Sequence, residues 1–444
     1  MSTGHPDRDD GPPSPAEAAV LDAVDPAELV RLLQQLIVIP SITGTAAESE
    51  AQHRYAAWLD AAGLEVDRWS LDLPALRAHP DHPGEEAARE EGWGVVGVLP
   101  AGPGGDLSNE DPSGAPALVL QGHIDVVPPG DLSAWPSSGP FGARADGSTV
   151  YGRGACDMKA GLVANLGVVL ALRRTGTRLR RPLALHSVVG EEDGGLGALA
   201  TLLRGHTGEA CVITEPTTGA LITANAGALT FRLEVTGRAA HGSVRYQGVS
   251  ALDAFRPVQD ALAELERERN RDVDPLLADR PIAYPLSIGT VRTGDWASSV
   301  PDLLVALGRY GVRLDEDPQE ARRQLAERVA AVCAADPWLR DHPVRLTWPG
   351  GQFASGRLAA GHPLLPQARA AVATVTGAPP GETGAPYGSD LRLYQGVGGI
   401  PTLHYGPGDV RHAHAPDEQV PVAELVDSCR SLALLTIRRC GLLA

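Results

Sequence analysis

The sequence predicts an α/β protein: an open, mostly parallel sheet covered by helices, interrupted by a smaller inserted α+β domain. Short apolar runs alternate with helical stretches through the first half of the chain, which is typical of a parallel sheet with helices on both faces. From about residue 226 the order of elements changes to β-α-β-β-α-β, the order of a ferredoxin-like sandwich. The α/β pattern then returns near the C-terminus.

The elements of the first half follow from periodicity and capping residues. Asp25 and Pro26 precede an amphipathic run, which predicts a helix that begins there. Residues 78–115 are rich in Pro, Gly, Asp and Glu and are expected to form a solvated loop. Apolar runs predict strands at 116–122, 182–189 and 210–214, and helical periodicity predicts helices at 47–63, 158–175 and 195–204.

The inserted domain begins with a strand in which Leu229, Phe231, Leu233 and Val235 alternate with polar residues. A helix at 250–270, strands at 284–293 and 302–314, a helix capped by Asp317 and the strand "PVRLTW" are expected to follow. A helix at 362–377, the strand "IPTLHY" and a helix at 421–443 then complete the main domain. The predicted organisation is a disordered tail at 1–25, the main domain at 26–225 and 351–444, and the inserted domain, called the lid below, at 226–350.

Composition limits the partners and the compartment. A net charge of −17 argues against nucleic acid and anionic membranes as partners. The five cysteines form no CxxC pair, which favours a reducing cytoplasm. The first residues are polar and proline-rich, unlike a signal peptide, and no apolar run approaches the roughly 20 residues of a membrane span. We therefore expect a cytoplasmic protein.

Metal-binding side chains follow several of the predicted strands. His123 comes at the end of the first, the pair Glu191 and Glu192 just after the second, and Glu215 directly after the third. The carboxyl ends of parallel strands share one edge of a sheet, so these side chains are expected to converge. With Asp157 and His414, they supply two histidines and three carboxylates, enough for two divalent ions if one carboxylate bridges, and leave a spare glutamate.

These motifs carry a family resemblance that runs from about residue 27 to the C-terminus. The segments "GHIDVVP", "GRGACDMKAG", "GEEDGG", "TEPT", "AAHGS" and "YGPGDVRHAHAPDE" occur in the order found in one zinc-dependent family. The chain resembles that family of acetylornithine deacetylase, succinyl-diaminopimelate desuccinylase, aminoacylase and carboxypeptidase G. The resemblance implies a two-metal, exopeptidase-like catalytic main domain and a lid that also serves for dimerisation.

The resemblance implies a ligand set. His123 and Glu215 would bind one metal ion, Glu192 and His414 would bind the other, and Asp157 would bridge them. The two divalent ions would be zinc, although Co²⁺ and Mn²⁺ also suit these donors. Two questions stay open at this point. His412 is an alternative ligand to His414, and Lys159, the chain's one lysine, stands beside Asp157 either by chance or for a required role.

Three further residues receive catalytic roles from the resemblance. Glu191 would be the general base, and Asp125 would hydrogen-bond His123 and fix its tautomer. His241 in the lid would polarise the scissile carbonyl, in its own or in a partner subunit, although a merely structural role is the alternative. The family also has a cis peptide after the bridging aspartate, which would be Asp157–Met158 here.

The expected substrate-binding residues are less closely matched. Ser298 stands where the family often has an asparagine that contacts substrate, so the pocket is expected to differ from that of well-known members. Arg313 matches an arginine linked to a substrate carboxylate, and Arg309 is its rival. Gly388 and Ser389 lie in "YGSDLR", which resembles a loop near the substrate.

Together these features predict a metal-dependent amidohydrolase that cleaves an N-acyl amino acid or a similar small N-acylated amine, as a deacetylase, desuccinylase or deformylase-like enzyme does. A dipeptidase or carboxypeptidase of the same family is the alternative. A non-catalytic member that binds a small molecule is a third hypothesis, but no ligand is missing and Glu191 is present. The resemblance also implies a homodimer through the lid and hinge movement near residues 224–227 and 349–356.

Overall fold

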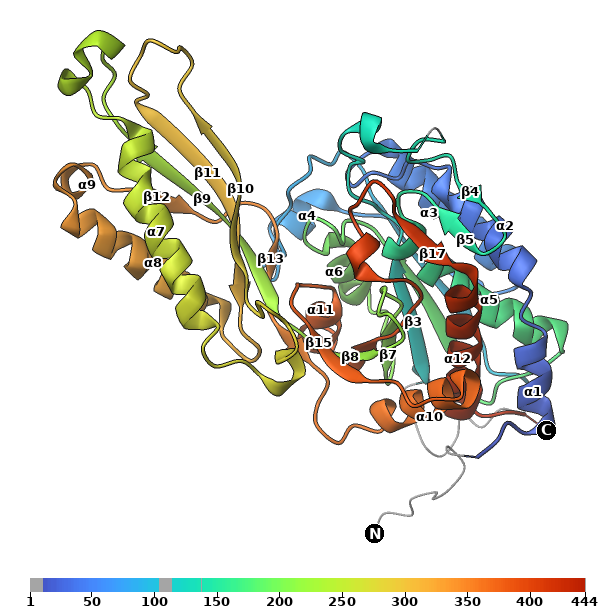
Figure 1. The fold of residues 1–444 in the computed structure, drawn as a ribbon. Coiled ribbons are helices and arrows are strands. Elements are labelled where there is room, and N and C mark those ends of the chain that lie inside the picture. The colour runs from blue at the N-terminus through green and yellow to red at the C-terminus, as the bar shows by residue number, and fades with distance from the viewer. Residues whose placement is uncertain (1–10, 104–113, 137, 444) are drawn as a thin grey trace.

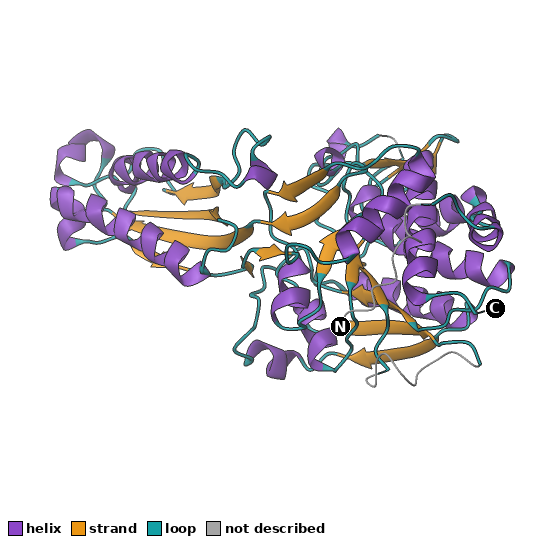
Figure 2. Cartoon of the chain, turned by 90° about the horizontal axis from the view of Figure 1, so that it is seen from below, coloured by secondary structure: helices purple, strands orange, loops and turns teal. Residues whose placement is uncertain are grey.

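The computed structural model describes residues 11–103, 114–136 and 138–443. The chain forms a main body that contains both terminal regions and a lid that projects from it (Figures 1 and 2). The predicted α/β class with an inserted α+β unit is confirmed.

A nine-stranded sheet forms the centre of the main body. Strands β6, β3, β7 and β16 run parallel to one another, and antiparallel strands flank them on both sides. The spatial order is β1 (Glu65–Ser70), β2 (Trp93–Leu99), β6 (Leu183–Val188), β3 (Leu118–His123), β7 (Cys211–Ile213), β16 (Thr402–His404), β8 (Leu221–Asn225) and β14 (Gly356–Arg357), with β15 (Glu382–Ala385) also paired to β8.

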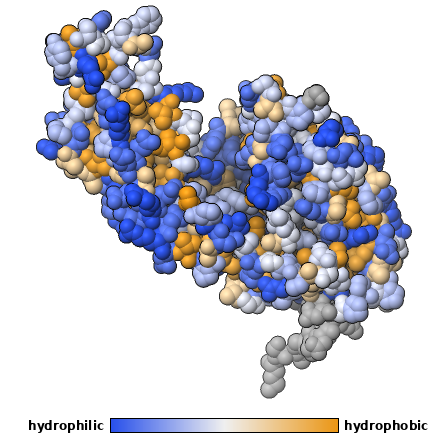
Figure 3. All heavy atoms as spheres, in the orientation of Figure 1, coloured by the Kyte–Doolittle hydropathy of each residue, from blue (hydrophilic) through white to orange (hydrophobic). Residues whose placement is uncertain are grey.

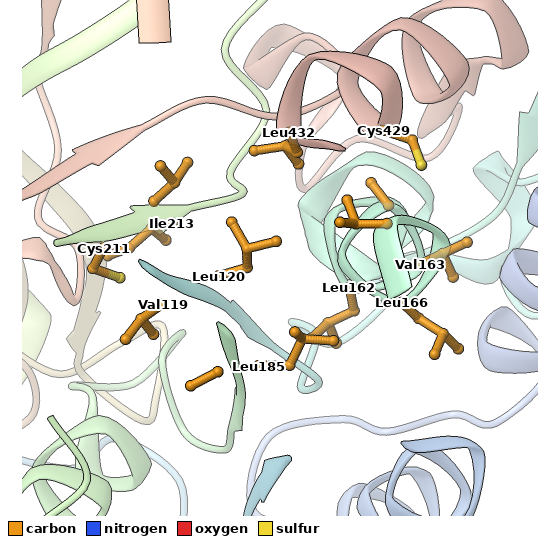
Figure 4. Close-up of a cluster of buried hydrophobic side chains, with 14 of the residues drawn as sticks. Val119, Leu120, Leu162, Val163, Leu166, Leu185, Cys211, Ile213, Cys429 and Leu432 are labelled. Atoms are coloured by element: carbon orange, nitrogen blue, oxygen red, sulfur yellow. The ribbon is translucent and has the colours of Figure 1, made fainter. Parts of the chain in front are cut away.

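Helices cover both faces of this sheet. Helix α5 (Ala160–Arg174) is buried along most of its length because it packs between the sheet and helices α2 (Pro26–Ile37) and α12 (Val422–Cys440). Figure 4 shows Leu162 and Leu166 of α5 with Leu432 of α12 in this core. Helices α3 (Ala46–Ala61) and α10 (Leu364–Thr376) complete that side, whereas α4 (Leu73–Arg77), α6 (Leu196–Leu203) and α11 (Leu391–Gly396) belong to the opposite one.

One helical stretch among the described residues, Ala155–Arg174, is long and apolar enough to cross a membrane. Its most apolar window is 89% buried inside the protein, as expected for the core helix of a globular fold.

The lid has the predicted sandwich topology. Its sheet order is β10 (Leu286–Thr293), β11 (Leu303–Val312), β9 (Gly227–Thr236) and β12 (Arg345–Thr347), all antiparallel. Helices α7 (Ala251–Arg269) and α8 (Pro318–Ala335) cover one face and bury the alternating apolar residues of β9, and α9 (Pro337–Asp341) follows α8.

The chain crosses between the two bodies twice. Strand β8 of the main sheet ends at Asn225 and the lid strand β9 begins at Gly227. On the return, β13 (Gln352–Phe353) pairs with β9 in the lid, and β14 pairs with β8 in the main body. Both crossings fall within the segments where the sequence predicted hinges, and the movement itself stays a prediction.

Two expectations for irregular segments differ from the structure. Helix α1 (Pro15–Asp22) forms inside the expected tail because Ser14 and Glu17 make a capping box and Val20 is fully buried. Residues 1–10 of that tail lie outside the described part of the chain. Within the expected solvated loop at 78–115, strand β2 forms and Arg89 is buried, while residues 104–113 are likewise not described.

Candidate metal centre and cleft

The predicted ligands meet at one end of the central sheet. His123 is the last residue of β3, the turn with Glu191 and Glu192 follows β6, and Glu215 follows β7. These three strands are parallel neighbours, so their carboxyl ends bring the side chains together. Asp157 comes from the segment before α5, and His414 from the loop between β16 and β17 (Gln419–Pro421).

Asp157 lies between the two histidines. Its Oδ1 is 3.1 Å from Nε2 of His123, and its Oδ2 is 3.5 Å from Nε2 of His414. On the outer sides, His123 Nε2 is 3.6 Å from Glu215 Oε1, and His414 Nε2 is 3.1 Å from Glu192 Oε2. One carboxylate thus faces two histidine–glutamate pairs, which is the arrangement that a bridging ligand requires.

The donor set suits cations. Donor atoms of His123, Asp157 and Glu192 lie within 4.8 Å of one another, and so do those of His123, Glu191 and Glu215. Burial raises the pKa values of the Glu191 and Glu215 carboxyls well above their usual range, and it also raises the pKa of Glu192. Four crowded carboxylates against two imidazoles leave an excess of buried negative charge, which divalent cations would neutralise.

His414 is held in a strained backbone conformation. Its φ is +61°, a left-handed value that is unusual for a residue with a side chain. Hydrogen bonds with Asp157 and Glu192 raise the pKa of the His414 imidazole to about 11. The neighbouring His412 is not among the residues that line the cleft. The strain and the two carboxylate contacts favour His414 over His412 as the ligand.

Asp125 acts on the site differently from what the sequence indicated. His123 Nδ1 lies 2.9 Å from the backbone carbonyl oxygen of Asp125, whereas the Asp125 carboxylate is 3.6 Å away. The carboxylate instead accepts hydrogen bonds from the backbone N–H groups of Glu191 and Glu192, both at 3.3 Å, and from the Thr43 hydroxyl at 2.9 Å. The backbone carbonyl therefore orients the histidine, while the side chain holds the glutamate turn.

Glu418, which was not predicted from the sequence, holds the backbone of the segment that carries Asp157. Glu418 is buried and accepts hydrogen bonds from the backbone N–H groups of Cys156 and Asp157, both at 3.1 Å. Arg153 pairs with the same carboxylate at 2.5 Å. The Asp157–Met158 peptide is cis, as the resemblance implied. Glu418 is the last residue of the "HAPDE" segment that begins with the predicted ligand His414. A carboxylate so close in sequence to a ligand is the feature from which its role could have been predicted.

Lys159 is fully buried, and its hydrogen bonds go to backbone carbonyl groups. Its ammonium donates hydrogen bonds to the carbonyl oxygens of Leu36 and Ile39, both at 2.9 Å. Burial lowers the pKa of Lys159 to about 7. The lysine therefore anchors the C-terminal end of α2 to the segment that carries Asp157.

A cleft of about 270 Å³ opens over the cluster. Arg309, Phe353, Tyr387 and Gly388 line it together with Glu191 and four of the predicted ligands: Asp157, Glu192, Glu215 and His414. The fifth, His123, is fully buried and is not among the lining residues. A larger cavity of about 770 Å³ adjoins it and shares Pro216, Tyr387 and Val410. The cleft thus joins residues of the main body to Arg309 from the lid.

Four other predicted residues are not among the cleft-lining residues. Ser389 is buried, with its hydroxyl 3.0 Å from His404 Nε2, and Arg313 donates a hydrogen bond of 2.8 Å to the carbonyl oxygen of Arg269 at the end of α7. His241 and Ser298 are exposed. The segment after His241 forms a short 3-10 helix at Gly242–Gln247, which Figure 1 shows in yellow-green at the end of the lid farthest from the main body.

Comparisons with known proteins agree with this geometry. The sequence pattern of Peptidase family M20/M25/M40 matches residues 119–438. An N-formyl-4-amino-5-aminomethyl-2-methylpyrimidine deformylase of Halalkalibacterium halodurans is 26% identical, with 94% of this chain and 95% of the relative aligned. A succinyl-diaminopimelate desuccinylase of Rhodopseudomonas palustris is 29% identical over 70% of this chain and 79% of the relative. The structure of human carnosine dipeptidase 1 aligns with a TM-score of 0.72 and 15% identity, covering 97% of this chain and all of that one.

Proposed function

Because this chain belongs to Peptidase family M20/M25/M40, we propose that it hydrolyses the amide bond of a small N-acylated amine at a centre of two divalent ions. The predicted family and the predicted class, a hydrolase of linear amide bonds, are both confirmed. The observation that carries the proposal is the position of Asp157 between His123 and His414, with Glu191 beside them.

The residues of the site divide the chemistry between them. Two divalent ions held by His123, Glu215, Asp157, Glu192 and His414 would lower the pKa of a water molecule toward 7 and polarise the scissile carbonyl. Glu191 accepts the proton of the attacking water and passes it to the leaving nitrogen. Burial raises the pKa of the Glu191 carboxyl, so its carboxylate form is a stronger base than that of an exposed glutamate.

The two cavities support a substrate in two parts. The cleft over the cluster has room for the acyl group, and the adjoining cavity of about 770 Å³ has room for the amine. The relative aligned over 94% of this chain is named for removal of a formyl group from an aminomethylpyrimidine, and a second relative for removal of a succinyl group. We favour a deformylase-like or desuccinylase-like reaction.

Arg309 is the residue proposed to bind an anionic acyl group or a carboxylate of the substrate. It is exposed at the cleft, and its guanidinium lies 5.5 Å from the Phe353 ring centre. No carboxylate partner of Arg309 occurs among the described residues. A dipeptidase reaction is the second candidate, because such an arginine equally suits the C-terminal carboxylate of a dipeptide.

The remote position of His241 supports a homodimer in which each lid completes the partner's active site. His241 and Ser298 lie side by side, since Gly242 N–H donates a hydrogen bond of 2.6 Å to the Ser298 carbonyl oxygen. The adjoining hairpin of β10 and β11 exposes Val291, Trp296 and Leu303, and Figure 3 shows hydrophobic side chains over the lid. Exposed apolar residues beside a remote catalytic candidate fit a two-fold interface.

Zinc is the proposed metal, because imidazole and carboxylate donors suit it, with Co²⁺ and Mn²⁺ as the alternatives. The five cysteines are free and buried, which supports the proposed cytoplasmic location.

A substrate panel tests the proposal. Zinc- or cobalt-loaded protein is incubated with N-formyl, N-acetyl and N-succinyl derivatives of amino acids and aminomethylpyrimidines, and with dipeptides, and the released amine is measured. Metal-dependent release from one acyl class supports the deacylase. Release from dipeptides alone supports the peptidase, and no release from protein that binds two ions would contradict both.

A further inference from the structure

A short segment before β2, residues 83–89, lies between the main body and the lid and is called the strap. On the lid side, the backbone N–H of Gln352 donates a hydrogen bond of 2.8 Å to the Pro83 carbonyl oxygen. The Glu86 carboxylate accepts a hydrogen bond of 2.7 Å from the Thr230 hydroxyl of β9. The strap is therefore bound to the lid at the second crossing.

On its other side the strap contacts the turn that carries Glu191 and Glu192. The Arg89 side chain is fully buried and pairs with the equally buried Glu48. Glu48 in turn accepts a hydrogen bond of 3.0 Å from the backbone N–H of Gly190, at the start of the turn. Asp193, after the two glutamates, lies 3.7 Å from the Arg89 guanidinium and accepts a hydrogen bond of 3.1 Å from Ala87 N–H. Both ends of the turn are thus fastened to the strap.

Glycines make this close contact possible. A Cβ on Gly190 would lie 2.7 Å from Nη2 of Arg89, and one on Gly194 would lie 2.3 Å from the Gly84 carbonyl oxygen. A Cβ on Gly84 would lie 1.8 Å from the Gly350 carbonyl oxygen, at the lid crossing. The turn, the strap and the crossing therefore pack against one another more closely than residues with a Cβ at these positions would allow. Because of this close packing, the three segments cannot shift independently.

We propose that Arg89 is a positioning residue for the catalytic turn, and that the strap fastens this turn to the lid crossing. The proposal rests on the proposed function, in which Glu191 is the base and Glu192 a ligand. Neither glutamate contacts Arg89 directly. The guanidinium acts through Glu48 and Asp193, which hold the backbone on either side of the two glutamates.

Four variants test the role of Arg89: Arg89→Gln, Glu48→Gln, the double variant, and Glu90→Gln as an exposed control in the same loop. Loss of a group that supports a metal ligand or base typically costs about 10- to 100-fold. We expect such a loss in kcat for Arg89→Gln, with KM changed by less than about threefold and two ions still bound. Because Gln can donate to Gln, the double variant should lose less than the product of the two single losses.

Hydrogen exchange gives a readout that does not depend on activity. The peptide that contains residues 190–195 should exchange at least about tenfold faster in Arg89→Gln than in the wild type, and unchanged in Glu90→Gln. Thr230→Val removes the hydroxyl that donates to Glu86 and leaves the weaker 3.4 Å hydrogen bond from Gly351 N–H. It should speed exchange of the same peptide and supplies the test if Arg89→Gln does not fold. Wild-type exchange in Arg89→Gln or in Thr230→Val would overturn the proposal. If the wild type cleaves no substrate, the proposed function fails while this measurement still decides the strap.

Discussion

Asp157 is the residue on which the geometry of the site depends, because each of its oxygens faces a different histidine. The sequence could identify it only through its motif, since nothing in residue spacing says that positions 157 and 414 meet. The structure shows how they do: Glu418 holds the backbone of Asp157, and the loop that ends at Glu418 also carries His414. Asp125 shows that a motif can identify a residue without giving the contacts of its side chain. Its carboxylate binds the glutamate turn, while its backbone carbonyl orients His123.

The paired histidines of that loop provide a test of the ligand assignment. His414→Gln should reduce bound zinc to about one ion per chain, because one of the two metal positions loses its imidazole. His412→Gln, two residues away, is the matched control and should keep two ions. Metal content by mass spectrometry after dialysis checks this. Two ions in His414→Gln and a loss in His412→Gln would reverse the assignment.

At the scale of elements, the central strands could be predicted because each combines a short apolar run with a polar residue at its carboxyl end. The strap could not, because its Pro, Gly and acidic residues are those of a solvated loop. Burial of Arg89 depends on Glu48 in α3 and on Asp193 after β6, and no local pattern reports such long-range partners. The prediction of a solvated loop is therefore wrong for residues 83–89, which lie where the main body and the lid meet.

His404, inside β16, makes stability depend on pH. Burial lowers its pKa to about 3, so the folded protein keeps the imidazole neutral where the unfolded chain, with an ordinary pKa near 6.5, takes up a proton. The contribution of His404 to the free energy of unfolding is complete above about pH 6.5. It is lost as the pH falls from there toward 3, by about 2 kcal/mol between pH 7 and 5.

Urea unfolding of metal-free protein between pH 5 and 7 measures this effect. In His404→Gln the free energy of unfolding should fall less steeply toward low pH, by up to about 1.4 kcal/mol per pH unit, than in the wild type. The control variant His412→Gln, at a half-buried position, should retain the wild-type slope. Equal slopes in wild type and His404→Gln would show that His404 is not kept neutral in the folded protein.

At the scale of the whole molecule, the lid carries two kinds of functional candidate. Arg309 reaches the cleft of its own chain, whereas His241 and Ser298 lie near the opposite end of the lid sheet. The β-α-β-β-α-β order predicted this sandwich, but not which end of its sheet faces the cleft. Strand β9 starts at the crossing and ends at Thr236, five residues before His241. The length of this strand therefore separates His241 from the crossing.

Subunit complementation tests whether His241 acts in the partner's site. Glu191→Gln and His241→Ala chains should each be nearly inactive alone. When the two are refolded or expressed together at equal amounts, random pairing makes half of the dimers mixed, each with one complete site, so about a quarter of wild-type activity should return. No recovery in dimers of twice the 46.4 kDa chain mass would contradict the exchange of His241.

The most direct test of the central claim is a zinc titration of metal-free wild type and Glu191→Gln, with amine release from the best panel substrate as the readout. The account predicts that wild-type activity rises with zinc until two ions are bound per chain. Glu191→Gln should bind the same two ions but turn over roughly 10²- to 10⁴-fold more slowly, because it cannot take the proton of the attacking water. Full activity in Glu191→Gln, or wild-type activity that is independent of metal, would contradict the account.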